Sequence, residues 1–260
     1  MKDKGLLCFH QGWTDIINSL SLINYYCQIY KELHVVVRQD SKPFVDFYTR
    51  TLSNCVIHYV EKDVIARMDF MSYAEGKDRL FHGCTDIHRD DAYRHKFSRS
   101  MSKIPIGQPG GHFVEKFFSP YDISYDVRVD YFDFARDEVL EDQIKTQFLV
   151  DYGDKPYILY HDQQDFRLNL EKQEGKNYIN LDGITDNPFL YIKVIQDCEA
   201  LHLVDSIWAT FVYLISSKIP SLSNKPINLY WFGRSGGLLN RADDKILSPY
   251  NPKNFNIIGK

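Results

Sequence analysis

Several features that would mark a familiar kind of site are missing from this sequence. Its five cysteines include no C-x-x-C pair, so the sequence favours neither a thiolate metal site nor a disulfide framework, and a reducing compartment is expected. No apolar run approaches the roughly 18 residues that a transmembrane helix needs. The apolar run that follows residues 1–5 is too short for the core of a signal peptide. We therefore expect a cytoplasmic protein without a membrane span.

An excess of basic charge and the common nucleotide-binding loops are also lacking. The 31 Lys and Arg residues are outnumbered by 35 Asp and Glu residues, so nucleic acid is not an expected partner. There is no G-x-x-x-x-G-K-[ST] loop and no G-x-G-x-x-G turn, which disfavours P-loop kinases and standard dehydrogenases. The absence of a D-x-D tripeptide and of clustered Cys and His ligands predicts no metal site. The segment G-R-S-G-G at 233–237 fits the G-x-S-x-G pattern, but no helical periodicity follows it, so it does not support the strand–elbow–helix of an α/β-hydrolase.

What the sequence does contain is an alternation of strand and helix patterns. The chain has 260 residues, of which 44% are hydrophobic, enough for one large domain or two small ones with a sizeable core. In the first part, short apolar runs alternate with segments of helical periodicity. These patterns predict strands over 5–9, 33–37, 55–60 and 80–84, and helices over about 13–31, 41–52 and 64–73.

The alternation breaks over about 85–110 and resumes after 153–156, a Gly- and Pro-containing stretch that is typical of a domain boundary. Between these points we expect a short helix over 111–118, a strand over 127–134 and a charged helix over 136–150. Beyond the boundary, we expect strands over 157–160, 178–181, 201–204 and 227–232, and helices over 187–197 and 206–216. The tail from Gly236 has no clear period.

Two strand–turn–helix segments, one at 9–20 and one at 199–209, organise this pattern. Each is the unit of a doubly wound domain, whose ligands lie beyond the carboxyl ends of the strands. The sequence therefore predicts an α/β protein with two compact Rossmann-like lobes, each with a largely parallel sheet, facing a cleft. The predicted lobes span 1–110 and 155–260, and 111–154 forms the connection.

Three motifs resemble glycosyltransferases of the GT-B type. The segment G-W-T-D-I-I-N-S-L-S-L at 12–22 resembles the G-x-G-D-x-x-x-x-L-P-L opening of the heptosyltransferase-like family. V-D-S-I-W-A at 204–209 resembles that family's V-D-T/S-x-x-A segment, where a helix start receives the donor phosphates. R-D-E at 136–138, followed by a strand ending in H-D at 161–162, resembles uncharacterised glycosyltransferase-like proteins. The chain departs from the pattern at Trp13-Thr14, at Ser21 and at Thr210, which stand where the family has x-Gly, Pro and His.

The resemblance implies a catalytic carboxylate at Asp15, directly after the first strand. A general base there would take the proton of an acceptor hydroxyl as it attacks the anomeric carbon. His10, at the end of the strand, is the alternative base. The plain structural alternative for Asp15 is a helix N-cap, a role that Thr14 could also fill, or an acidic residue in the first turn of the helix. For His10 the alternative is a hydrogen bond within the turn.

The second lobe is predicted to hold the donor. Ser206 begins a helix whose free N–H groups and dipole suit a diphosphate, although it could be only an N-cap. Asp205 more plausibly orients a ribose hydroxyl or a loop amide, because it would repel phosphate. His161 and Asp162 end a strand at the predicted cleft, and His161 could donate to phosphate. Arg38 and Arg234 end strands in the two lobes and could pair bidentately with a diphosphate, although each could also be a solvated surface residue.

The leading functional hypothesis is a metal-independent glycosyltransferase that moves a sugar from a nucleotide-sugar donor to a glycan or other hydroxyl acceptor. The nucleotide-sugar would be a co-substrate, so no cofactor is expected. The departures at Trp13 and Thr210 keep open an alternative, a non-catalytic nucleotide- or sugar-binding module with the same fold.

Overall fold

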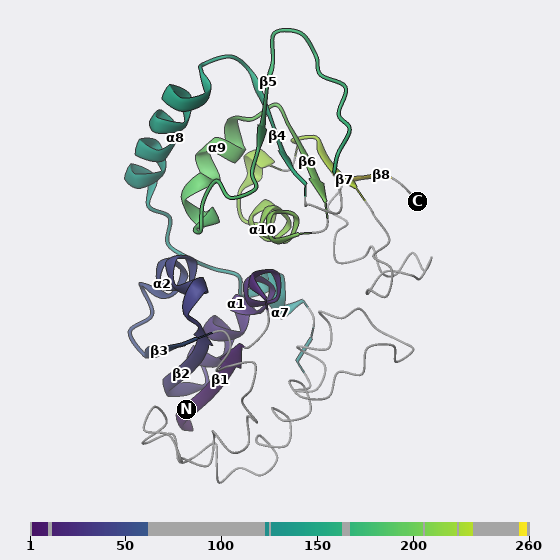
Figure 1. Ribbon diagram of the computed structural model, residues 1–260. Helices are drawn as coiled ribbons and strands as arrows, with labels where there is room; N and C mark the ends of the chain where they lie inside the picture. The colour runs from purple at the N-terminus through teal and green to yellow at the C-terminus, as the bar shows by residue number, and fades with distance from the viewer. Residues whose placement is uncertain are drawn as a thin grey trace. The chain divides into compact units, whose positions relative to one another are not determined.

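The computed structural model describes residues 2–9, 12–61, 123–124, 126–162, 167–204, 206–222, 224–230 and 255–258 (Figure 1). Two compact units divide the chain, one over Met1–Phe134 and the other over Ala135–Lys260. Each unit contains its own sheet, and every strand pair in both sheets is parallel. The predicted fold class, an α/β protein with two parallel-sheet lobes, is confirmed. The strand predicted over 80–84 and the helices predicted over 64–73 and 111–118 lie outside the described residues.

The sheet of the first unit has three strands, in the order β1 (Lys2–Phe9), β2 (Tyr30–Arg38) and β3 (Cys55–Val60). The central strand β2 is buried from Leu33 through Arg38, as the continuous apolar run V-V-V predicted for a strand of a parallel sheet. Helices α1 (Trp13–Cys27) and α2 (Lys42–Thr49) lie on the same side of this sheet (Figure 1). A short 3-10 turn, η1 (Gln39–Ser41), leads into α2.

The apolar positions of α1 give the helix its packing face. Ile16, Leu20 and Ile23 follow helical spacing, and each is fully buried, so the periodicity that predicted this helix also predicted its buried side. The helix ends at Cys27, four residues before the predicted end. Tyr30 belongs instead to β2, where its ring lies 2.8 Å from the position a side chain at Gly5 would take. Only glycine allows this close approach of β1 and β2.

The segment after the long undescribed stretch corrects one prediction. Residues 127–134 alternate like a strand, but the chain forms a one-turn helix, α7 (Val127–Asp130), and then continues without regular structure. Arg128 explains the difference, because its side chain is buried with 1% exposed and Nη1 donates to Asn18 Oδ1 in α1 at 3.1 Å. Apolar and polar residues do alternate over 127–134, but packing of this segment against α1 determines its local conformation.

The sheet of the second unit has five strands, in the order β5-β4-β6-β7-β8. Their bounds are Tyr157–His161 for β4, Asn177–Asn180 for β5, Ala200–Val204 for β6, Ile227–Tyr230 for β7 and Phe255–Ile258 for β8. The last strand was not predicted, because it lies in the tail after Gly236, where the sequence has no clear period.

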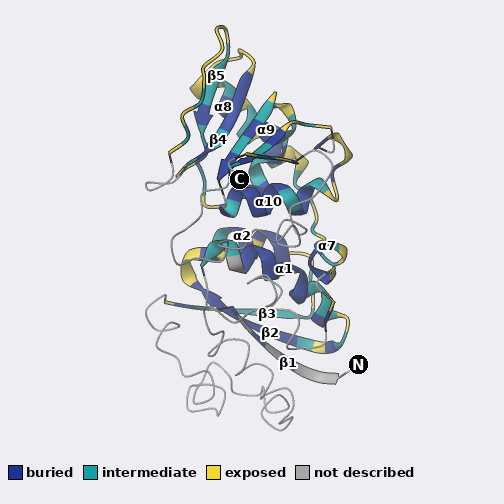
Figure 2. Cartoon of the chain, turned by 90° about the vertical axis from the view of Figure 1, so that its right-hand side faces the viewer, coloured by how far each residue is buried: buried dark blue, intermediate teal, exposed yellow. Residues whose placement is uncertain are grey.

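Helices flank this sheet in the predicted order. They are α8 (Glu138–Tyr152), the 3-10 helix η6 (Pro188–Tyr191) continuing into α9 (Ile192–Asp197), α10 (Ile207–Ser216), and the 3-10 turn η7 (Pro220–Leu222). α10 is almost entirely buried, as the dark colour of this helix in Figure 2 shows. In α8, the carboxylate of Glu141 is completely buried and paired with Arg136. Among the helices of the described residues, none combines the length and apolarity required to cross a bilayer.

Candidate functional site

The predicted site residues differ in how far the structure describes them. His10, Asp205 and Arg234 lie outside the described residues, and for Asp15 only the backbone is described, as the third residue of α1. Arg38, His161, Asp162 and Ser206 are described with their side chains. The following geometry therefore concerns two places, the end of β4 and the start of α10 in the second unit, and the end of β2 in the first.

In the second unit, the parallel sheet brings the carboxyl ends of β4, β5 and β6 to one edge. His161, the last residue of β4, lies opposite Leu203 of β6, three residues before Ser206. Tyr160 of β4 lies opposite Asn180 of β5. The edge where His161, Asp162 and Ser206 gather is thus the carboxyl edge, where ligands of open α/β sheets bind.

Ser206 is the N-cap of α10. Its backbone is extended (φ −159°, ψ 178°), its Oγ accepts a hydrogen bond from the N–H of Ala209 at 3.4 Å, and the residue is 2% exposed. The plain structural role considered for this serine is therefore confirmed. Such a cap satisfies one of the first four N–H groups of a helix, which have no hydrogen-bond partner within the helix itself.

Trp208 connects the start of α10 to the end of β5. Its Nε1–H donates to the carbonyl oxygen of Leu181 at 3.1 Å, directly after β5. The ring is 4% exposed. This indole therefore determines where the helix N-terminus lies relative to the carboxyl edge. The sequence analysis missed it because the tryptophan was matched only to a variable position of the family motif.

His161 is the most unusual group at this edge. The side chain is 4% exposed, and its Nδ1 is buried without a hydrogen-bond partner among the described residues. Burial lowers the pKa of His161, and the nearby charges of Asp182 and Asp162 oppose this effect without reversing it. The imidazole is therefore neutral at pH 7, and one of its ring nitrogens has an unmet hydrogen-bonding capacity, which is costly in a buried group.

Asp162, which follows His161, is held by the adjacent strand. Asn180 Nδ2 donates to Asp162 Oδ1 at 2.7 Å, and Asn180 Oδ1 accepts from the backbone N–H of Asp182 at 3.0 Å. This chain of hydrogen bonds orients the carboxylate at the end of β4. Asn180 was not predicted as a site residue, because nothing in its local sequence distinguishes it before the strand order is known.

In the first unit, Arg38 is engaged by its own chain. Its Nε donates to Asp40 Oδ1 at 3.0 Å, its Nη2 contacts Asp40 Oδ2, and the residue is 9% exposed. The considered alternative of a solvated surface arginine is therefore wrong, because the residue is buried and paired. The bidentate geometry that would suit a diphosphate is directed instead at a carboxylate.

The start of α1 also differs from the start of α10. Its N-cap is Gly12, in extended conformation, and no side chain caps the helix. The expectation that Thr14 or Asp15 caps α1 is wrong, since both lie inside its first turn. Trp13, where the family pattern has a variable residue, packs edge-on against Phe44 with ring centroids 5.7 Å apart.

His202, in the middle of β6, is half-buried and hydrogen-bonded. Its Nδ1 lies 2.8 Å from Tyr230 Oη, and its Nε2 lies 3.4 Å from Asn228 Nδ2. Burial lowers the pKa of this imidazole too. His161 and His202 therefore form a contrasting pair on neighbouring strands, because within the described part of the chain Nδ1 has a partner at His202 and none at His161.

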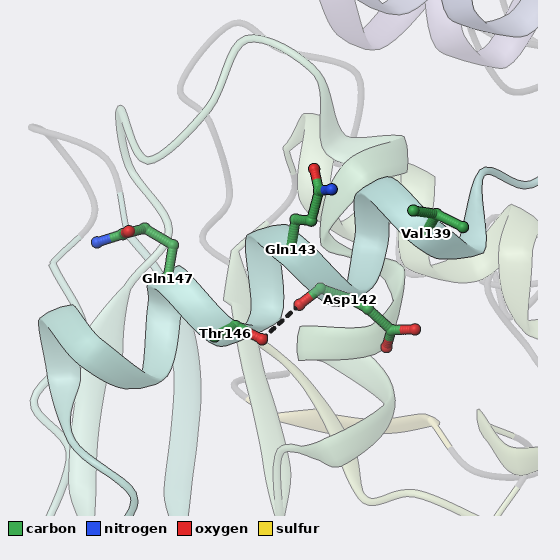
Figure 3. A pocket seen from close by; sticks show the side chains of 5 residues that line it. All are labelled: Val139, Asp142, Gln143, Thr146 and Gln147. Carbon is green, nitrogen blue, oxygen red and sulfur yellow. Dashed lines mark hydrogen bonds between the residues drawn. The ribbon is translucent and has the colours of Figure 1, made fainter.

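Two further features complete the description of the second unit. In the part of the chain that the structure describes, no group of three or more His, Cys, Asp or Glu side chains is arranged to hold a metal ion. A shallow hollow on the surface of α8 is lined by Val139, Asp142, Gln143, Thr146 and Gln147 (Figure 3). None of the predicted site residues lines it, and the Thr146 hydroxyl is directed to the carbonyl of Asp142 at 2.8 Å.

Comparison with known proteins places the fold. No protein-family model and no curated protein matches this sequence. Among solved structures, the chain is similar to a glycosyl transferase family 9 protein from Veillonella parvula, with a TM-score of 0.53 and 9% identity, over 99% of this chain and 87% of that one. It also aligns with the ADP-heptose LPS heptosyltransferase II of E. coli, with a TM-score of 0.48 and 12% identity, over 99% and 90% of the two chains. The first of these confirms the predicted GT-B-like fold class.

Proposed function

We propose that this protein is a glycosyltransferase that moves a sugar from a nucleotide-sugar to a hydroxyl acceptor without a metal ion. The observation that carries the proposal is the buried Nδ1 of His161, which has no partner among the described residues at the carboxyl edge beside the N-terminus of α10. A helix N-terminus attracts anions, and an unsatisfied buried imidazole is stabilised by a ligand that supplies its missing partner. The GT-B-like fold supports glycosyl transfer as the class of reaction in this proposal.

In this proposal, the second unit holds the diphosphate of the donor. The first-turn amides of α10 and the N–H of His161 donate to phosphate oxygens, and they stabilise the charge that develops when the bond to the sugar breaks. Asp162, oriented by Asn180, is suited to hydroxyl groups of the donor, because its negative charge disfavours direct contact with phosphate. Asp205 and Arg234 belong to the same proposed site on sequence grounds.

The first unit supplies the general base, Asp15 or His10. The base removes the proton of the acceptor hydroxyl, whose oxygen attacks the anomeric carbon as the nucleoside diphosphate leaves. Amide and imidazole donors replace the metal ion that would otherwise neutralise the diphosphate. The same residue types in a non-catalytic module would bind the nucleotide-sugar without turnover, and this is the competing hypothesis.

The proposal is tested by thermal-shift and calorimetric titration with a panel of nucleoside diphosphates and nucleotide-sugars, with and without EDTA. A ligand at about 100 times its Kd stabilises the folded state by about 2.7 kcal/mol, which raises Tm by several degrees. We expect this stabilisation to persist in EDTA. If no nucleotide stabilises the protein, or if binding requires a divalent ion, the proposal is wrong.

His161→Gln and His202→Gln form a matched pair for locating the site. Both replace an imidazole on adjacent strands, buried at His161 and half-buried at His202, but of the two only His161 has a ring nitrogen without a partner among the described residues. We expect His161→Gln to weaken nucleotide binding by about 10- to 100-fold, the loss of one charge-assisted hydrogen bond, while His202→Gln leaves the affinity unchanged. Equal effects of the two substitutions would show that the loss is structural. Acceptor screening of the wild type then separates enzyme from binding module.

A further inference from the structure

Two cysteines that are distant in sequence meet in the first unit. Cys27 is the last residue of α1, and Cys55 is the first residue of β3. Asn54, directly before β3, connects this strand to the end of α1. Its Nδ2 donates both to the carbonyl oxygen of Cys27 at 2.8 Å and to that of Tyr30 at 2.9 Å. Its own carbonyl accepts from the N–H of Leu33 at 2.7 Å. The backbone around both cysteines is therefore held in place.

The side chains of Cys27 and Cys55 lie next to each other, and both residues are half-buried rather than enclosed. The interaction with the Cys55 thiol lowers the pKa of Cys27 and outweighs the opposing effect of burial. The same interaction, followed by burial, raises the pKa of Cys55. Cys27 is thus the thiol that ionises first, and Cys55 is positioned beside it.

We propose that Cys27 and Cys55 are a reversible dithiol–disulfide pair that is oxidised by exchange with a low-molecular-weight disulfide such as oxidised glutathione. The Cys27 thiolate, having lost its proton to solvent, attacks one sulfur of glutathione disulfide and releases one glutathione thiolate. Cys55 then loses its proton and attacks the Cys27 sulfur of the mixed disulfide, releasing the second glutathione. Both cysteines are oxidised, one glutathione disulfide is reduced to two thiols, and no other reactant is required.

Cys198 provides an internal contrast. It is 1% exposed, its thiol donates to the carbonyl of Ile195 at 3.1 Å, and burial raises its pKa to about 12. A thiol in this environment is neither ionised nor accessible. The proposed reactivity therefore depends on the local arrangement at Cys27 and Cys55.

The test is disulfide mapping of the folded wild-type protein after incubation with oxidised glutathione, followed by alkylation and digestion without reductant. We expect a covalent link between Cys27 and Cys55 that dithiothreitol reverses, with Cys198 recovered as a free thiol. Trypsin leaves Cys8 and Cys27 on one peptide, 5–31, so fragmentation of the linked peptide must place the bond at Cys27. The link closes a loop of about 29 residues and should raise Tm by roughly 5–10 °C.

Single variants distinguish the two roles. Cys55→Ser should accumulate the mixed disulfide of glutathione on Cys27, because the resolving thiol is missing, whereas Cys27→Ser should leave Cys55 mostly unmodified. In the unoxidised wild type, iodoacetamide should label Cys27 at least about tenfold faster than Cys198. The proposal is overturned if Cys27 and Cys55 remain free thiols, carry glutathione separately, or pair with Cys8 in the folded wild-type protein.

Discussion

Both units contain a strand followed by a turn and a helix, but the polar side chains at the strand ends differ in their hydrogen-bond partners. At the end of β2, Arg38 is buried and paired with Asp40. At the end of β4, His161 is equally buried, yet its Nδ1 has no partner among the described residues. The chain thus satisfies the charged group of the first unit internally and leaves the neutral group of the second unit available to a ligand. This difference between Arg38 and His161 is the reason for which we propose the anion site in the second unit.

The largest effect expected from this comparison concerns the first unit, where the proposed general base lies. Asp15→Asn should lower glycosyl transfer by about 10²–10⁴-fold, because the acceptor hydroxyl is no longer deprotonated as it attacks. Donor affinity should stay unchanged, because the proposed donor site lies in the other unit. Steady-state kinetics together with nucleotide titration measure both quantities.

Asp46→Asn is the control for this substitution. Asp46 is an acidic residue of the same unit, half-exposed in α2 and paired with Lys42, and its loss should not change turnover. If the Asp15→Asn variant folds and keeps full activity, Asp15 is not the general base and His10 becomes the candidate. Full activity in His10→Ala as well would remove the base from this segment altogether.

The next largest expected effect comes from substitutions at the N-caps of α10 and α8. Ser206→Ala should weaken nucleotide binding by about 1.5–3 kcal/mol, because a hydroxyl beside the proposed diphosphate site is lost. The loss of the helix cap should also lower stability by about 0.5–2 kcal/mol. Asp137→Ala is the matched control, since Asp137 Oδ1 caps α8 by accepting from Leu140 N–H at 3.0 Å. It should reproduce the loss of stability without any loss of affinity. If both variants bind nucleotide as the wild type does, Ser206 is only a cap.

The sequence predicted the elements well where apolar periodicity was long. The buried faces of α1 and the apolar run of β2 required no tertiary information, and β3 was predicted with its observed bounds. The strand predicted over 127–134 failed because Arg128 is anchored to Asn18, which lies 110 residues away in the chain. Periodicity within a short window cannot detect such an anchor.

For the candidate site, the sequence predicted which residues end strands but not how their side chains are satisfied. His161 and Arg38 looked equivalent, as polar groups at strand ends, until the structure placed Asp40 against one of them. Asn180 and Trp208 acquire their importance only through the strand order β5-β4-β6, which the sequence does not encode locally. The site prediction therefore identified the edge of the sheet, and the partners came from the fold.

Breaking the Arg38–Asp40 ion pair tests whether Arg38 has a purely structural role. Asp40→Asn removes the negative charge beside the buried Arg38 guanidinium and should lower stability by about 1–2 kcal/mol, less than for a fully buried pair because Asp40 is partly exposed. Nucleotide affinity should not change, as titration of the folded variant would show. A clear gain or loss of affinity would return Arg38 to the donor site, as the sequence alone suggested.

The smallest expected effect is a pH dependence that separates His161 from the other histidines. Burial lowers the pKa of His58, His161 and His202 in the folded protein, whereas an unfolded histidine has a pKa of about 6.5. As pH falls below about 6.5, the unfolded chain therefore binds protons before the folded protein does. Stability is complete above this pH and decreases as pH falls through the folded pKa values. Thermal melts between pH 8 and pH 5 should show this decrease.

Binding of the proposed diphosphate should shift the pKa of His161 in the direction opposite to the effect of burial. The phosphate charge favours the protonated imidazole, so the pKa of His161 should rise on binding, and nucleotide affinity should increase as pH falls from about 7.5 to 6. His161→Gln should remove this part of the increase, while any increase due to protonation of the nucleotide itself remains. His202→Gln should keep the full wild-type dependence. If His161→Gln and the wild type gain affinity equally on acidification, the anion does not contact His161, and the asymmetry between the two units has another cause.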